Sequence, residues 1–144
     1  MNNSKIFNPQ AKILANVDRA IEHIETSYTS PVLVEVDPSN ACNHACSFCL
    51  SAYIHFDKYK GTEAFSRALM SRDVLMNLCK DFVDMGVRAV NWTGVGEPTL
   101  NKHLKEAIEY CGQNGIKMGM FTNGTLFDKW DMFETLVEHM TWVR

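Results

Sequence analysis

The strongest constraint on the fold is a regular alternation of short apolar runs with amphipathic segments. The apolar runs lie at residues 32–36, 87–92 and 116–121, and a fourth begins at residue 141. The segments with apolar side chains at helical spacing lie at residues 71–86, 101–115 and 127–140. Strands that alternate with helices form parallel sheets with right-handed crossovers. The sequence therefore predicts an α/β fold with the order β-α-β-α-β-α-β.

The boundaries of two predicted helices carry local signals. Ser71 and Asn101 are candidate N-caps, and Gly86 and Gly115 are candidate terminators. The predicted buried faces are Val74, Leu75, Leu78, Cys79, Phe82 and Val83 in one helix, Leu104, Ala107, Ile108 and Cys111 in the next, and Met132, Phe133, Leu136 and Val137 in the third. Cys79 and Cys111 therefore read as small core residues rather than ligands.

A further amphipathic stretch precedes the first strand. Its apolar stripe predicts one helix over residues 10–28, entered near Pro9 and stopped before Pro31. We divide the chain into this N-terminal helical segment, residues 1–30, and an α/β region, residues 31–144. Residues 51–70 mix aromatic and charged side chains, and we expect a lid-like segment or a short helix there.

Three cysteines, Cys42, Cys46 and Cys49, stand within eight residues directly after the first predicted strand. Thiolates this close in sequence can converge on one metal centre. Structural zinc sites and iron–sulfur cubes usually take four protein ligands. Three sulfur donors therefore suggest a centre with one open position. The alternative is a zinc knuckle with His44 as the fourth ligand, which is disfavoured because structural zinc sites normally pair two separated half-sites.

Two more unusual stretches follow the next two predicted strands. Gly94-Val95-Gly96-Glu97-Pro98 comes after the second strand, and Thr122-Asn123-Gly124 comes after the third. Ligands of parallel α/β sheets and barrels bind at the carboxyl ends of the strands. We expect all three stretches to meet on that one rim. Gly94 and Gly96 would let the backbone come close to a ligand.

These residues resemble the signature of the radical S-adenosylmethionine (radical SAM) enzymes. Cys42, Cys46 and Cys49, with Phe48 before the last cysteine, resemble the family's cluster motif, and residues 94–98 resemble its Gly-Gly-Glu-Pro stretch. Val95 stands where the family usually has a second glycine. The resemblance covers residues 32–144. It implies parallel β/α units that form about half of a radical-SAM-type partial TIM barrel.

The resemblance also implies the cofactors and the reaction. The three cysteines would bind a 4Fe-4S cluster, and S-adenosylmethionine would chelate the fourth iron. Phe48 would give the cluster an apolar wall. The remaining expected cofactor-binding residues are Gly94, Gly96, Glu97, Pro98, Thr122 and Asn123. An external donor of flavodoxin or ferredoxin type would reduce the cluster, and reductive cleavage would give a 5′-deoxyadenosyl radical that abstracts hydrogen from an unknown substrate.

Composition narrows the remaining possibilities. The net charge of −3, without a basic patch, gives no sign of nucleic-acid binding, and no apolar run is long enough to span a membrane. Five cysteines, three of them crowded, favour metal ligation in a reducing, cytoplasmic setting over a disulfide framework.

The extent of the chain leaves three alternatives. We favour a fragment of a longer protein. Otherwise the chain completes its barrel with another copy, by self-association through an open sheet edge, or with another chain, or it is a non-catalytic cluster- or zinc-binding module that serves as a scaffold or interaction domain.

Overall fold

The computed structural model describes residues 9–49 and 68–144. The chain divides into two compact units, Met1–Val32 and Leu33–Arg144, and each is described by itself. The predicted lid-like segment at residues 51–70 lies largely outside the described residues. Among the described helices, none has both the length and the apolar character needed to cross a membrane.

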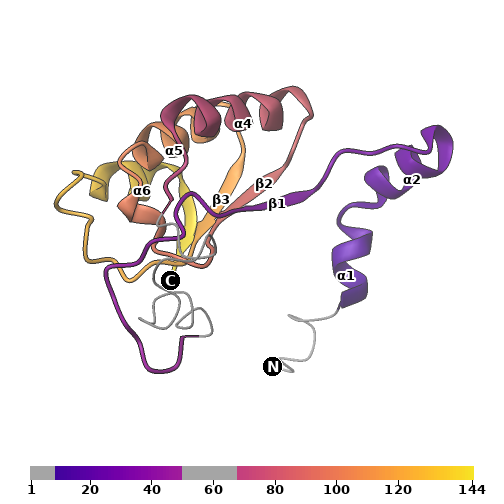
Figure 1. Ribbon diagram of the computed structural model, residues 1–144. Coiled ribbons are helices and arrows are strands. Elements are labelled where there is room, and N and C mark those ends of the chain that lie inside the picture. Colours follow the sequence, from indigo (N-terminus) through magenta and orange to yellow (C-terminus); the bar gives the residue numbers. More distant parts are fainter. Residues whose placement is uncertain (1–8, 50–67) are drawn as a thin grey trace. The chain divides into compact units, whose positions relative to one another are not determined.

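The larger unit is built on a parallel sheet of four strands in the order β1-β2-β3-β4 (Figure 1). The strands are β1 (Leu33–Val36), β2 (Ala89–Trp92), β3 (Lys117–Met120) and β4 (Met140–Val143). Three helices connect them: α4 (Arg72–Asp84), α5 (Leu104–Gln113) and α6 (Phe133–His139), with the short 3-10 helix η4 (Pro98–Leu100) before α5. The predicted β-α-β-α-β-α-β order is confirmed.

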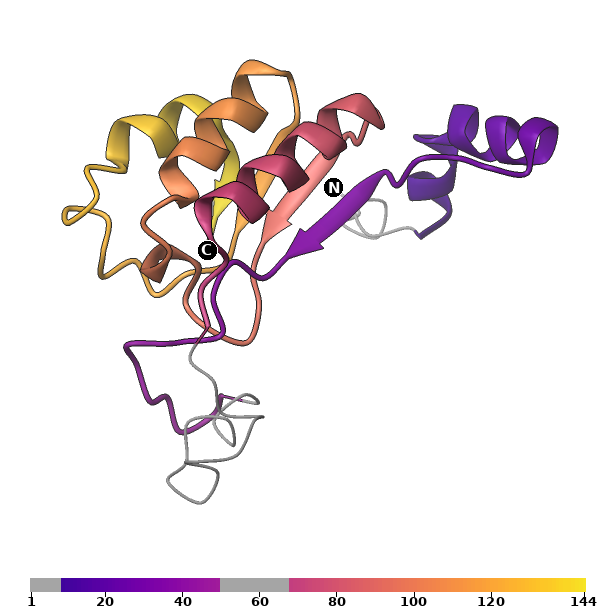
Figure 2. The ribbon, with the colours of Figure 1, turned by 45° about the horizontal axis from the view of Figure 1, so that its top comes forward.

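The three helices lie together on one face of this sheet (Figures 1 and 2). Val90, Trp92, Met118 and Met120 point from the strands into the layer between sheet and helices, where each is almost completely buried. The sheet is open rather than closed, in keeping with part of a barrel. On its other face the ring of Trp142 covers Gly119, where an added Cβ would lie 2.2 Å from the indole.

The helix signals read from the sequence operate largely as expected. The Ser71 side chain accepts a hydrogen bond from the Val74 amide at 3.3 Å, so Ser71 caps α4. Gly86 and Gly115 follow α4 and α5 with φ of 68° and 79°, a conformation that glycine adopts without strain. Asn101 lies two residues before the observed N-cap of α5, and its side-chain oxygen accepts a hydrogen bond from the His103 amide at 3.0 Å. Its NH2 group also donates to the carbonyls of Pro38 and Met70, which links the loops after β1 and β2.

The predicted third helix begins later than expected. Residue 127 was the predicted start, whereas α6 begins at Phe133 after a series of turns. Asp131 interrupts any earlier helix because its φ of 50° lies in the left-handed region. The predicted apolar face is correct for the buried Met132 and Leu136 and wrong for Phe133 and Val137, which are exposed.

The N-terminal unit also differs from its prediction. The single helix expected over residues 10–28 is two helices, α1 (Pro9–Leu14) and α2 (Val17–Thr26). A hydrogen bond from the Asn16 amide to the Ile13 carbonyl, at 3.0 Å, closes a tight turn that separates them. The apolar side chains of α2 are not buried, so packing does not enforce one continuous helix.

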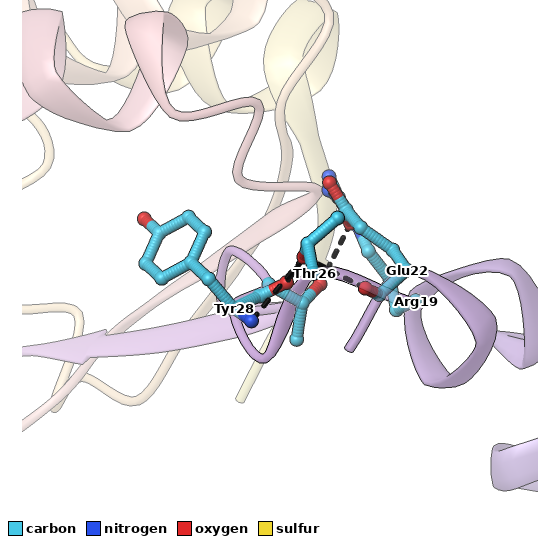
Figure 3. A network of polar contacts seen from close by, with 5 residues as sticks. Arg19, Glu22, Thr26 and Tyr28 are labelled. Carbon is cyan, nitrogen blue, oxygen red and sulfur yellow. Dashed lines mark hydrogen bonds and ion pairs between the residues drawn. The ribbon is translucent and has the colours of Figure 1, made fainter. Parts of the chain in front are cut away.

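A network of polar contacts links α2 to the residues that follow its C-terminal end (Figure 3). Arg19 donates to the Glu22 carboxylate at 3.0 Å, and the Thr26 hydroxyl donates to the carbonyls of Glu22 and Tyr28 at 2.8 and 2.6 Å. The hydrogen bond from Thr29, followed by that from Arg19, lowers the pKa of the Glu22 carboxyl. These bonds fix the exit of the chain from α2, where Ser27 adopts a left-handed φ of 59°.

Candidate cofactor site at the carboxyl ends of the strands

The three unusual stretches meet on one rim of the sheet, as the sequence predicts. They leave the carboxyl ends of β1, β2 and β3, and Figure 2 shows the cysteine loop leaving the arrowhead of β1. The first two loops are joined where the Glu97 amide donates to the Ala41 carbonyl at 2.7 Å. The second and third are joined where the Asn123 amide donates to the Glu97 carboxylate at 2.8 Å.

The cysteine loop carries its thiols near the surface. Cys42 and Cys46 are half-buried, Cys49 is exposed, and all three are free thiols. The Cys49 amide donates to the Cys46 carbonyl at 3.1 Å, which folds the second half of the motif into a tight turn. The His44 amide donates to the Cys42 sulfur at 3.4 Å. These two backbone hydrogen bonds fold the loop locally around Cys42 and Cys46.

In this conformation the three sulfurs are not gathered around a point. Within residues 9–49 and 68–144, no group of three or more His, Cys, Asp or Glu side chains is arranged to hold a metal ion. Phe48 is 85% exposed, so its ring is not packed into an apolar wall in this conformation. The ligand set and the role of Phe48 stay predictions, and they require the loop to draw inward.

Glu97 is the buried centre of the rim. Only 2% of the surface of this residue is exposed. One carboxylate oxygen accepts hydrogen bonds from the Thr99 amide at 3.0 Å, the Thr99 hydroxyl at 2.5 Å and the Thr122 hydroxyl at 2.6 Å. The other accepts from the Asn123 amide. Glu97 therefore holds η4 and the loop after β3 together, and Pro98, the first residue of η4, is buried beside it.

An amide pair ties the cysteine loop to the loop after β3. Asn43, which directly follows Cys42, accepts from the Asn123 side chain at 2.9 Å and donates to the Thr125 hydroxyl at 2.8 Å. The Asn123 side-chain oxygen in turn accepts from the amide and hydroxyl of Thr125. Asn123, expected to bind a cofactor, thus contacts the cluster motif through Asn43. Sequence reasoning did not single out Asn43, and only its place beside Cys42 could have suggested it.

The two glycines of the second loop allow close approach between loops. A Cβ on Gly96 would lie 2.3 Å from the carbonyl oxygens of Ser39 and Ala41, so only glycine fits beside the cysteine loop. A Cβ on Gly94 would lie 1.9 Å from the Asp37 carboxylate. The sequence argument assigned this freedom to a ligand. In the structure it serves the contact between the loops after β1 and β2, and the ligand role stays a prediction.

The two remaining cysteines are core residues, as their helical spacing indicates. Cys79 on α4 and Cys111 on α5 are fully buried. Their mutual hydrogen bond lowers the pKa of Cys79, and the same bond together with burial raises the pKa of Cys111. They lie in the helical layer, so the three cysteines of the rim loop are a distinct set.

The radical SAM superfamily model matches residues 36–144 of this chain, which includes all three rim loops. The chain belongs to the radical SAM superfamily. Members of this superfamily use a 4Fe-4S cluster and S-adenosylmethionine, and their chemistry is cleavage of S-adenosylmethionine with radical formation. They generally require a reductant and a substrate.

Individual relatives differ in what they do. The chain is 32% identical over 111 residues to GTP 3',8-cyclase of Actinobacillus pleuropneumoniae serotype 7, covering 76% of this chain and 30% of that protein. It is 30% identical over 112 residues to mycofactocin maturase MftC of Mycolicibacterium smegmatis, covering 75% of this chain and 25% of that protein. It is 29% identical over 98 residues to an S-adenosylmethionine-dependent nucleotide dehydratase of Selenomonas ruminantium, covering 65% of this chain and 30% of that protein. The alignments therefore span less than a third of these curated relatives. No solved structure matches the chain.

The chemistry of the donor set fits the family's cluster. Three free thiols stand on one loop at the carboxyl rim, and none of them is used in a disulfide. The neighbouring loops are joined by the buried Glu97 and by the Asn43–Asn123 pair, so hydrogen-bonded loops lie beside the three cysteines. The chain offers three sulfur donors here, and a 4Fe-4S cluster bound by three cysteines retains one iron for another ligand.

Proposed function

We propose that this chain is the cofactor-binding part of a radical SAM enzyme, in which Cys42, Cys46 and Cys49 hold a 4Fe-4S cluster and the neighbouring loops receive S-adenosylmethionine. The observation that carries the proposal is the convergence of three free thiols and two interlocked loops on one rim of a parallel sheet, in a chain of this superfamily. The finer assignments of Phe48 and residues 94–98 belong to the same proposal.

When bound by Cys42, Cys46 and Cys49, a 4Fe-4S cluster would supply the electron for reductive cleavage of S-adenosylmethionine. The residues of the chain perform binding and positioning. Thiolates of the rim loop would ligate the iron of the cluster, and the His44 amide donates a hydrogen bond to the Cys42 sulfur beside it. Glu97 and Asn123 join the second and third loops, so that the exposed Gly94 and the half-buried Gly96 would offer their backbone to a ligand in a fixed geometry. Phe48 would exclude water once the loop closes.

Partners follow from the same proposal. A one-electron donor of flavodoxin or ferredoxin type would approach the exposed Cys49 side of the rim. Five free cysteines suit a reducing setting such as the cytoplasm. The relatives include a GTP cyclase, a nucleotide dehydratase and a mycofactocin maturase, so they do not select one substrate class.

The test is anaerobic reconstitution of the 144-residue chain with iron and sulfide, followed by S-adenosylmethionine and a strong reductant. The proposal predicts about four irons per chain and release of 5′-deoxyadenosine, both lost in Cys46→Ala. Cys79→Ala is the matched control, because it removes a thiol from the helical core and should leave the iron content unchanged. A colourless protein with tightly held zinc would instead support the non-catalytic module.

Self-association through the open sheet is a separate part of the proposal. The edge strand β4 is largely exposed, with Trp142 and Val143 each about two-fifths accessible. Unpaired strand edges and apolar sheet faces favour pairing with further strands. Sedimentation or gel filtration of the 144-residue chain should show concentration-dependent association, and a strictly monomeric protein at high concentration would rule it out.

A further inference from the structure

A second carboxylate, which the sequence does not mark as unusual, lies where the chain leaves β1. Asp37 is the first residue after β1, five positions before Cys42. One of its oxygens accepts a hydrogen bond from the Val95 amide at 2.8 Å. The other is enclosed by the protein and has no hydrogen-bond partner among the described residues. An acceptor buried without a partner costs free energy, so its retention calls for a reason.

The partner loop is shaped around this carboxylate. Gly94 has a φ of 126°, which side-chain-bearing residues rarely adopt. A Cβ at Gly94 would lie 1.9 Å from both the carboxyl carbon and the unpartnered oxygen of Asp37. The glycine thus provides both the backbone angle and the space that the carboxylate occupies. One oxygen of Asp37 occupies the space that a side chain at Gly94 would need, and the other accepts the hydrogen bond from the Val95 amide.

We infer that Asp37 is a positioning residue that sets the orientation of the Gly94–Val95 peptide for ligand binding. Two carboxylates then hold the loop after β2 at opposite ends: Asp37 from the β1 side and the buried Glu97 from the β3 side. The exposed Gly94 between them presents its backbone to the rim in one conformation. We call the contacts of Asp37 with the Gly94–Val95 peptide the Asp37 clamp. The identity of the ligand, S-adenosylmethionine, rests on the proposed function, whereas the clamp rests on the contacts described above.

The first test compares two substitutions in the reconstituted chain by equilibrium binding of S-adenosylmethionine. Asp37→Ala should weaken binding about tenfold or more while iron and sulfide per chain stay unchanged, because the peptide loses its only described side-chain restraint. Asp37→Asn retains an oxygen that can accept the Val95 amide and should stay within about threefold of the original affinity. Asp84→Ala, an exposed aspartate at the end of α4, is the matched control. Equal losses in Asp37→Asn and Asp37→Ala would overturn the positioning role, since charge alone would then matter.

The second test needs no ligand and therefore separates this inference from the proposed function. Hydrogen exchange of the Val95 amide should be about tenfold faster in Asp37→Ala than in the original chain and little changed in Asp37→Asn. In addition, Gly94→Ala should destabilise the Asp37→Ala background less than the original chain, since the clash is then removed. If the original chain fails to bind S-adenosylmethionine, the proposed function fails. The exchange rate of the Val95 amide and the coupling between the Gly94 and Asp37 substitutions still test whether Asp37 restrains the Gly94–Val95 peptide. Unchanged Val95 exchange with additive effects of the two substitutions would refute it.

Discussion

Replacing Glu97 by Gln tests whether one buried carboxylate holds the rim together. The change keeps the shape of the side chain and exchanges one acceptor oxygen for an N–H donor. With the amide oxygen toward Thr99 and Thr122, the new NH2 group faces the Asn123 amide, which loses its acceptor. A hydrogen bond from a buried N–H to a charged acceptor contributes about 2 kcal/mol. For a chain of 144 residues, such a loss lowers the melting temperature by about 6 °C.

The assay is thermal unfolding followed by circular dichroism, with Glu138→Gln as the control. Glu138 lies on α6 with a side chain 68% exposed, and removal of its charge should change stability by less than about 0.5 kcal/mol. Glu97→Ala, which removes all four hydrogen bonds, should cost about 4 kcal/mol. If Glu97→Gln and Glu138→Gln melt within about 1 °C of each other, the carboxylate does not organise the rim in the way described.

Three further predictions concern contacts away from Glu97. The hydrogen bond from Arg72 lowers the pKa of the Glu106 carboxyl, so this pair stabilises the fold fully above the ordinary glutamate pKa of 4.5 and loses its contribution as the pH falls through the lowered pKa. Arg72→Gln should therefore be less stable than the original chain at pH 7 and equally stable in acid. A difference in stability that persists in acid would contradict this prediction. Ser71→Ala should lower the free energy of unfolding by about 1 kcal/mol in urea titrations through loss of the cap on α4, and an unchanged midpoint would contradict it. Asn43→Ala breaks the hydrogen bond to Asn123 and should speed the removal of iron from the reconstituted protein by a chelator. The free energy of unfolding of the iron-free chain should change by less than about 0.5 kcal/mol. Equal rates of iron loss in the variant and the original chain would refute a role of Asn43 in holding the cysteine loop.

The order of strands and helices was predictable because apolar periodicity reports burial directly. Leu104, Ala107, Ile108 and Cys111 repeat at helical spacing, and all four are fully buried in α5. The late start of α6 was not predictable in the same way. A left-handed residue at Asp131 leaves the apolar spacing of its neighbours unchanged, so the pattern continued where the helix did not.

The rim shows a similar division. Strand order alone places the cysteine loop, residues 94–98 and residues 122–124 on one edge, because parallel strands share a direction. Which side chains hold these loops together depends on contacts between distant positions. Asp37 and Gly94 are far apart in sequence, and only the close approach of their loops makes the glycine necessary. No periodic pattern encodes such a pair.

The same limit applies to the break between α1 and α2. The apolar stripe runs through it without interruption, but its side chains are exposed, so burial does not hold the helix continuous. The division of the chain into residues 1–30 and 31–144 stays a prediction.

The most direct test of the central claim is the electron paramagnetic resonance spectrum of the reduced, reconstituted chain before and after addition of S-adenosylmethionine. An iron with an open position should respond to a ligand that binds it, so the account predicts a 4Fe-4S signal that changes on addition and is absent in Cys42→Ala, Cys46→Ala and Cys49→Ala. A signal that is unaffected by S-adenosylmethionine, or one that survives loss of any of these three cysteines, would contradict it.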